Sequence, residues 1–173
     1  MKKTLIIYST TDGHTKKICN YISEKLEQNF RSKIISLDKS KNIDLTKYDL
    51  IIVGASIRYG KHKSELYSFI HRNLAQLNSI DSAFFSVNAV AMKDNKCSAD
   101  TNPYMQKFLE LSPWSPKKLA VFAGKIDYPK YKFIDKHMIR LIMWITKGPT
   151  NTKNTYEFTD WNTVDEFSKQ LNT

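Results

Sequence analysis

The chain is poor in cysteine, glycine and proline, and each shortage excludes a class of protein. Only two cysteines, Cys19 and Cys97, occur in 173 residues, and they form no CxxC pattern. They indicate neither a disulfide framework nor a zinc site, so we expect a reducing, cytoplasmic environment. Five glycines and five prolines in a chain that is 41% hydrophobic argue against disorder. The length favours a single domain over residues 1–173.

Long hydrophobic runs are also missing. No stretch approaches the roughly 20 uncharged residues that span a bilayer, and the N-terminus carries no apolar signal core. Any membrane contact is therefore expected to be peripheral. Acidic residues are in the minority, since 27 Lys and Arg against 17 Asp and Glu give a formal net charge of +10. A charge of this sign favours anionic partners such as nucleic acid, acidic lipid or a carboxylate-bearing substrate.

Strand-like and helix-like segments alternate along the chain, which is typical of α/β proteins. Crossovers between successive strands predict a flavodoxin-like, doubly wound five-stranded parallel sheet of order 2-1-3-4-5, with ligands at the carboxyl ends of its strands. Residues 125–154 depart from the alternation and are predicted to form an insertion after the fifth strand. We predict strands at residues 4–8, 32–37, 48–54, 82–88, 118–124 and 155–158, and helices at 15–28, 64–77, 104–111 and from about Asp160.

A loop rich in hydroxyl groups joins the first predicted strand to the first helix. Gly13 permits a tight backbone path there, and a helix N-terminus directs its N–H groups toward an anion. The hydroxyl groups can donate hydrogen bonds to a phosphate without a cation. The same residue types also cap helices without binding any ligand, which is the alternative interpretation. The loop comprises Ser9, Thr10, Thr11, Asp12, Gly13, His14 and Thr15.

Two more polar loops are predicted at the same edge of the sheet, after the third and fourth strands. In the first, Tyr59 offers an aromatic face for an isoalloxazine ring; alternatively, it packs beneath its loop. Backbone groups near Asn88 can address the polar edge of such a ring. Gly54 stands where a phospho-acceptor response regulator needs an aspartate, which excludes that class. We therefore predict FMN as the cofactor, surrounded in addition by Ala55, Ser56, Ile57, Arg58, Tyr59, Gly60, Ser86, Val87 and Asn88.

Motifs along nearly the whole chain resemble those of the menaquinone-dependent protoporphyrinogen IX dehydrogenase family. They are STTDG at 9–13, GASIRYG at 54–60, SAFFSVN at 82–88, TNPY at 101–104, AGKIDYPKY at 123–131 and TDW at 159–161. The resemblance implies an FMN-dependent enzyme of haem biosynthesis that oxidises protoporphyrinogen IX to protoporphyrin IX in three two-electron steps. It also implies menaquinone or ubiquinone as acceptor, at the cytoplasmic face of the bacterial inner membrane. We add Gly124, Lys125, Ile126, Asp127 and Tyr128 to the predicted cofactor site.

Positive charge is concentrated in and beside the insertion. Residues 117–147 hold eight Lys or Arg against two Asp, a net +6. Drawn as a helix, the segment has one apolar face (Ile134, Met138, Leu141, Ile142, Ile145) and one basic face (Lys132, Lys136, Arg140, Lys147). Such a helix suits an anionic membrane surface, or else packs on the domain with its charges solvated.

The same cations suit the propionates of a porphyrinogen. We predict a substrate group of Arg58, Lys125 and Lys130, with Tyr128, Tyr131 and Phe133 flanking the macrocycle. His62, His71 and His137 are candidate proton acceptors by residue type alone, so no catalytic side chain is assigned.

Three rival functions have distinct signatures. A flavodoxin-type electron carrier is typically acidic, unlike this chain, and an NAD(P)H:quinone oxidoreductase would be reduced by NADPH. No nucleic-acid recognition motif accompanies the charge, so we expect no nucleic-acid partner. A homo-oligomer is compatible with the sequence.

Overall fold

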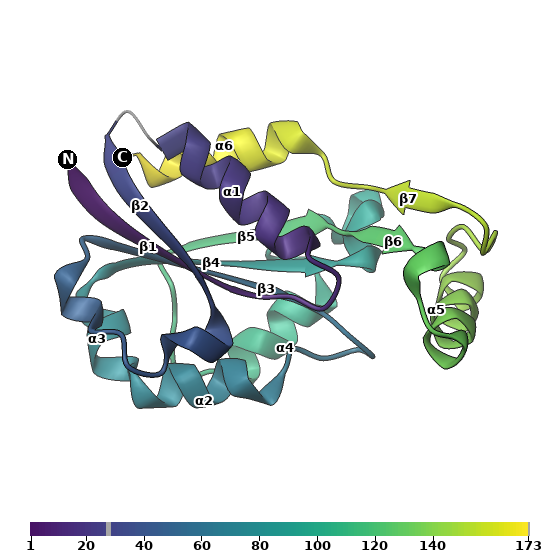
Figure 1. Cartoon of the computed structure of the whole chain (residues 1–173), viewed down its shortest axis with the longest axis horizontal. Helices are drawn as coiled ribbons and strands as arrows, with labels where there is room; N and C mark the ends of the chain where they lie inside the picture. Colours follow the sequence, from purple (N-terminus) through teal and green to yellow (C-terminus); the bar gives the residue numbers. More distant parts are fainter. Residues whose placement is uncertain (27–28, 173) are drawn as a thin grey trace.

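A parallel five-stranded sheet lies at the centre of the computed structural model, which describes residues 1–26 and 29–172. Its strand order, β2-β1-β3-β4-β5, confirms the predicted flavodoxin-like topology (Figure 1). Residues Ser9, Ala55 and Ser86 lie side by side in neighbouring strands, so the carboxyl ends of β1, β3 and β4 meet at one edge. The strands are β1 (Lys2–Ser9), β2 (Phe30–Ser36), β3 (Leu50–Ser56), β4 (Asp81–Asn88) and β5 (Lys118–Ala123).

Helices cover both faces of the sheet, which explains why the strands read as continuous apolar runs. On one face lie α1 (His14–Leu26) and α6 (Trp161–Leu171); on the other lie α2 (Ser64–Arg72), α3 (Leu74–Ser79) and α4 (Pro103–Leu111) (Figure 1). Each layer encloses its own hydrophobic core. Short 3₁₀ turns occur at Leu37–Ser40, Leu45–Lys47, Ala89–Met92, Asp94–Lys96 and Tyr128–Lys130.

Several helix boundaries differ from the prediction. The single helix expected over 64–77 is divided at Asn73, whose side-chain amide donates to the Phe69 carbonyl oxygen and ends α2. Asn competes with the helical backbone in this way, and hydrophobic spacing alone does not reveal the break. The first helix begins at His14, and the end expected at Gln28 lies outside the described residues. At α6, Asp160 accepts a hydrogen bond from the Asn162 N–H, as its predicted position at the helix start implies.

Gly54 has a packing role in the middle of the sheet. A Cβ at this position would collide with the Phe85 ring on the neighbouring strand. The missing side chain therefore allows β4 to place a phenylalanine in the core beside α6, where Phe85 meets Phe167 edge-on at 6.2 Å between ring centroids.

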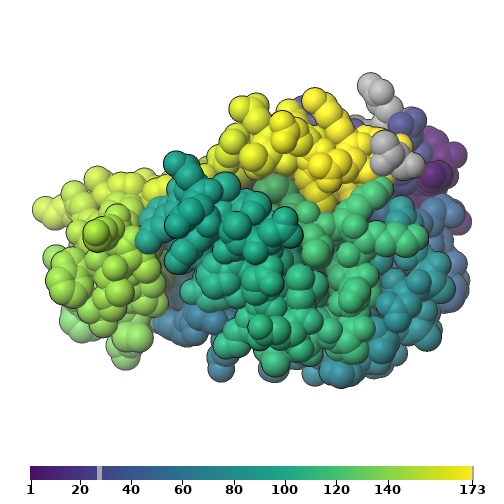
Figure 2. All heavy atoms as spheres, turned by 180° about the vertical axis from the view of Figure 1, so that it is seen from behind, coloured from purple at the N-terminus to yellow at the C-terminus, as the bar shows by residue number. Residues whose placement is uncertain are grey.

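The insertion forms a small unit at one end of the molecule. Strands β6 (Lys125–Asp127) and β7 (Thr155–Glu157) pair antiparallel, and α5 (Phe133–Ile145) lies between them in the chain. Its own core is small and contains Ile126, Tyr128 and Met143. Seen from behind, its yellow-green atoms lie together at one end of the molecule (Figure 2). Within α5 only Met143 is buried, so most of the helix surface faces outward.

Candidate functional site

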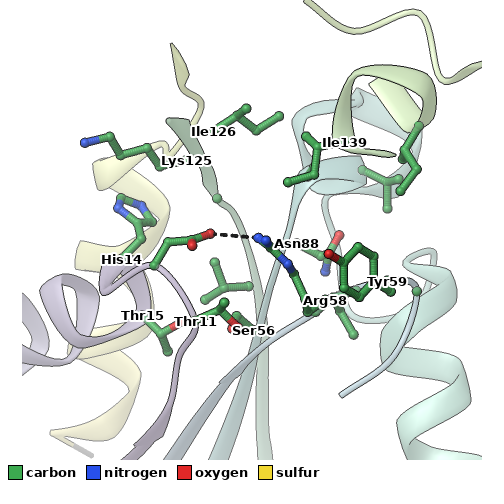
Figure 3. Close-up of a pocket in the computed structure, with 18 of the residues that line it drawn as sticks. Thr11, His14, Thr15, Ser56, Arg58, Tyr59, Asn88, Lys125, Ile126 and Ile139 are labelled. Carbon is green, nitrogen blue, oxygen red and sulfur yellow. Dashed lines mark hydrogen bonds and ion pairs between the residues drawn. The ribbon is translucent and has the colours of Figure 1, made fainter. Parts of the chain in front are cut away.

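A cleft opens at the carboxyl edge of the sheet, between the first loop, the loops after β3 and β4, and α5 (Figure 3). It brings together most of the predicted cofactor residues from segments far apart in the sequence. Those that line it are Thr10, Thr11, Asp12, His14, Thr15, Ser56, Ile57, Arg58, Tyr59, Gly60, Val87, Asn88, Gly124, Lys125 and Ile126.

The remaining predicted residues do not line the cleft. Tyr128 is fully buried in the insertion, and its hydroxyl donates to the Pro149 carbonyl oxygen at 2.8 Å. Ser9, Ala55 and Ser86 are buried, and Gly13 and Asp127 are sequence neighbours of lining residues. Several lining residues were not among the predicted cofactor residues, although Tyr131 was predicted to flank the substrate. Most of them belong to the insertion: Ala89, Val90, Tyr104, Tyr131, Ile139, Ile142, Met143 and Thr146.

The first loop has the geometry of an anion cradle. Gly13 adopts φ +83°, and its N–H donates to Thr10 Oγ1 at 3.0 Å, which folds the loop over the start of α1. The first N–H groups of a helix have no partners within it and favour an anion there. Thr15 Oγ1 is buried and, among the described residues, has no hydrogen-bond partner. A phosphate at this position would supply the missing acceptor, so the loop fits a phosphorylated cofactor.

His14 fixes the loop to the C-terminal part of the chain. Its Nε2 lies 2.6 Å from Thr159 Oγ1, and the Thr159 hydroxyl donates to the Ala123 carbonyl oxygen. Because that hydroxyl proton is already used, His14 Nε2 is the donor and carries the proton. Burial lowers the pKa of His14, which favours the neutral ring. The imidazole therefore acts as a neutral brace beside the cradle.

Arg58 crosses the cleft. Its guanidinium lies 3.2 Å from an Asp12 oxygen on the first loop and 3.4 Å from an Asp135 oxygen on α5. Its Cζ stands 5.2 Å from the ring centroids of both Tyr59 and Tyr131. We call this set of four contacts the Arg58 clasp; it ties three separate segments together.

Tyr131 also links the insertion to the first loop. Its hydroxyl donates to Asp12 at 3.2 Å and accepts from the Asp127 N–H. Burial raises the pKa of Tyr131 to about 12, so the phenol stays protonated. With these side chains in place the cleft encloses about 140 Å³, below the roughly 300 Å³ at which small-molecule sites begin. A flavin-sized group would therefore need a wider cleft than these side chains leave.

Tyr59 sits at the tip of a strained turn. Arg58 and Lys61 exchange backbone hydrogen bonds across Tyr59 and Gly60, whose φ angles are +50° and +76°. Two central residues with positive φ define a type I′ turn, in which a tyrosine is unfavourable. The Tyr59 hydroxyl bonds to Asp135, while 49% of the residue remains exposed. Strain retained at the rim of a cleft indicates a functional position for this ring.

A buried polar network supports the cleft from below. His62 Nε2 lies 3.1 Å from Ser86 Oγ, which also accepts from the Asn88 side-chain amide. Asn88 and Asn102 exchange amide hydrogen bonds at 3.3 and 3.1 Å. Burial lowers the pKa of His62 to about 4, so its ring is neutral at pH 7. Asn102 was outside the predicted site, although it determines how Asn88 is held.

The predicted substrate cations are each engaged with a carboxylate. Lys125 and Lys130 both approach Asp127, at 3.6 and 3.2 Å, and Arg58 belongs to the clasp. Phe133 is 77% exposed, whereas Tyr128 is fully buried. Their assignment to the substrate stays a prediction. Within residues 1–26 and 29–172, no helix has the length and apolar character needed to traverse a bilayer.

Comparisons with known proteins agree with this architecture. A family profile described as "Flavodoxin domain" matches residues 5–153. The chain is 39% identical over 170 residues to protoporphyrinogen IX dehydrogenase [quinone] of Escherichia coli K12, covering 98% of this chain and 94% of that protein. It is 40% identical over 171 residues to the protein of the same name from Leishmania major, covering 98% and 74%.

Solved structures share the fold at low sequence identity. A flavoprotein from Lactobacillus acidophilus, determined in complex with FMN, matches with a TM-score of 0.50 and 21% identity, covering 70% of this chain and 93% of that one. Two-electron reduced flavodoxin from Megasphaera elsdenii matches with a TM-score of 0.50 and 12% identity, covering 68% and 84%.

Proposed function

The chain belongs to the flavodoxin-domain family of quinone-dependent protoporphyrinogen IX dehydrogenases, and from this premise we propose that it oxidises protoporphyrinogen IX to protoporphyrin IX through bound FMN. The electrons pass to a respiratory quinone, menaquinone or ubiquinone, and the reaction serves haem biosynthesis. The observation that carries the proposal is the reach of the similarity, which covers 98% of the chain and therefore includes the insertion as well as the flavodoxin-like sheet.

Different residues of the cleft would contact the phosphate and the ring of FMN. The 10–15 loop and the Thr15 hydroxyl would receive the phosphate, and Tyr59 would offer an aromatic surface to the ring. FMN, when bound, supplies the two-electron chemistry. Ile139, Ile142 and Met143 of α5 line the cleft and would restrict the access of water to a bound cofactor. Arg58, which lines the same cleft, would place a cation beside the bound cofactor.

The visible spectrum of the FMN-loaded protein tests this function. Anaerobic protoporphyrinogen IX should bleach the flavin bands while porphyrin absorption grows, and a menaquinone analogue should then restore the bands. Flavin that binds but stays oxidised under substrate would exclude the dehydrogenase. Bleaching by NADPH instead would favour a nicotinamide-dependent quinone reductase.

We propose in addition that α5 docks on an anionic membrane, at the cytoplasmic face of the bacterial inner membrane, where the quinone is dissolved. The side of α5 away from Met143 carries an exposed apolar arc, consisting of Phe133, Ile134, Met138, Leu141, Trp144 and Ile145. Phe133 and Ile134 are 77% and 75% exposed, and Trp144 is 70% exposed. Exposed basic residues beside the arc, Lys132, Arg140 and Lys147, suit anionic headgroups.

Vesicle binding can be followed from Trp144 itself, because Trp114 is fully buried and Trp161 is half-buried. Vesicles rich in phosphatidylglycerol should shift the tryptophan emission to shorter wavelength, and phosphatidylcholine vesicles should not. Leu141→Glu should abolish the shift, while Ser115→Glu, an equal charge change at an exposed loop residue, should retain it. Ile142 is unsuitable for this test because it lines the cleft. Equal binding by both variants would contradict the membrane role of α5.

A further inference from the structure

A second hollow lies on the other side of the Tyr59 turn from the cofactor cleft. It is an open groove of about 650 Å³ between the loop after β3, the start of α2, and α4, within the roughly 300–1,000 Å³ typical of small-molecule sites. Its position matters because the two hollows share a wall: Ile57, Arg58, Tyr59, Gly60 and Tyr104 line both. A ligand in the groove would therefore lie against the residues that face the cofactor.

Two of the lysines that line the groove have no carboxylate partner among the described residues. Among the described residues, the ammonium groups of Lys61 and Lys107 have neither an ion pair nor a hydrogen bond, although both residues line it. Lys63 instead donates to the Thr10 carbonyl oxygen at 3.1 Å. The one carboxylate in the lining, Glu65, is bonded to the Ser64 hydroxyl. The groove thus presents two free cations to an anionic ligand, in contrast to Lys125 and Lys130, which share Asp127.

The rest of the lining suits a flat apolar body. Tyr59, Tyr67 and Tyr104 contribute aromatic surface, and Leu111 at the end of α4 is 54% exposed. Tyr104, Lys107 and Leu111 are spaced by three and four residues, so they lie along one face of α4. A single helix face therefore offers an aromatic ring, a cation and an apolar side chain in sequence.

We infer that this groove is the binding site for the porphyrinogen, with Lys61 and Lys107 receiving its carboxylates and Tyr67, Tyr104 and Leu111 contacting the macrocycle. The assignment rests on the proposed function and deepens it. It moves the carboxylate contacts from the insertion, where the sequence suggested them, to the groove between α2 and α4. Because the wall of residues 57–60 is shared, a macrocycle held here lies next to the cofactor cleft, as direct electron transfer requires.

The test uses the FMN-loaded protein, with protoporphyrin IX and its dimethyl ester as probes, because the ester keeps the macrocycle and lacks both charges. The double variant Lys61→Gln/Lys107→Gln should weaken binding of the free acid about tenfold, as expected for two solvated ion pairs, and leave ester binding unchanged. Lys117→Gln/Lys169→Gln removes two exposed lysines elsewhere and should bind both probes like the wild type. FMN content of each variant verifies folding.

Each other outcome has a definite meaning. If the wild type binds the acid and the double variant binds it equally well, the groove assignment is wrong while the proposed function stands. If Lys125→Gln/Lys130→Gln weakens binding of the free acid instead, the carboxylates are bound by the insertion. If the wild type binds neither probe, the groove assignment is overturned, and the proposed function is then judged by whether protoporphyrinogen IX bleaches the flavin. Should the double variant lose FMN, Leu111→Glu serves in its place and should weaken both probes; unchanged binding there would also overturn the assignment.

Discussion

Replacing Thr15 by valine should have opposite effects on the free chain and on cofactor binding. Thr15 is fully buried and its Oγ1 has no partner among the described residues. An unsatisfied buried polar group costs about 1–3 kcal/mol, so valine, which has the same shape, should stabilise the cofactor-free chain by about 1 kcal/mol. For a domain of this size that corresponds to a rise in Tm of about 2–4 °C.

The same substitution removes a donor to the phosphate. A hydrogen bond to a charged group contributes about 1.5–3 kcal/mol, so FMN should bind roughly 10- to 100-fold more weakly. Fluorescence titration of FMN gives the Kd, and thermal unfolding without FMN gives the Tm. Thr4→Val is the matched control, because Thr4 Oγ1 is likewise buried without a partner but lies on β1 away from the cleft. It should raise the Tm and leave the Kd unchanged.

The reasoning would be refuted if Thr15→Val lowered the Tm of the cofactor-free chain while FMN affinity stayed at the wild-type value. That pair of results would mean that the hydroxyl serves the helix start rather than a ligand. A fall in both properties would show that the hydroxyl supports the loop conformation as well as the phosphate.

Three further predictions concern the support of the site. The pKa of His62 falls from 6.5 to about 4 on folding, so the unfolded state binds more protons than the folded state between these pH values. The free energy of unfolding should therefore decline by about 3 kcal/mol as the pH falls from 6.5 to 4. Urea unfolding across this range measures that decline, and His62→Gln should reduce it. Tyr59→Asn should relieve left-handed strain and raise stability by about 1 kcal/mol while weakening FMN binding, and a higher FMN affinity would contradict the stacking role. Gly54→Ala should lower stability by about 1–3 kcal/mol through collision with Phe85, measurable by urea unfolding, and Phe85→Leu should partly restore it.

The sheet was predictable because hydrophobic burial leaves a local signature. Residues 50–55 are buried throughout and read as an uninterrupted apolar run. The 9–15 loop was equally readable, since Gly13 and its hydroxyl-bearing neighbours stand between a strand and a helix. Such signals depend on residues adjacent in sequence, which a single chain displays directly.

The clasp was not predictable, because it depends on the placement of three distant segments. Asp12, Arg58 and Asp135 meet only after the sheet edge and α5 are positioned, and nothing in their local sequences signals the contact. Hydrophobic spacing likewise identified the apolar residues of α5. It did not show that most of them face outward while Met143 faces inward. Side-chain pairing and the orientation of an inserted helix are set by tertiary packing, so they emerge only from the structure.

Helix α5 connects the two processes that the proposed function requires. One side of it supplies Ile139, Ile142 and Met143 to the cofactor cleft, and the other carries the exposed apolar arc. A helix is about 10 Å across, so a membrane seated on the arc would lie about one helix diameter from the cleft. The groove between α2 and α4 lies beyond the Tyr59 turn and draws no residue from α5. On these two proposals, the quinone would approach the cofactor from the α5 side and the porphyrinogen from the groove.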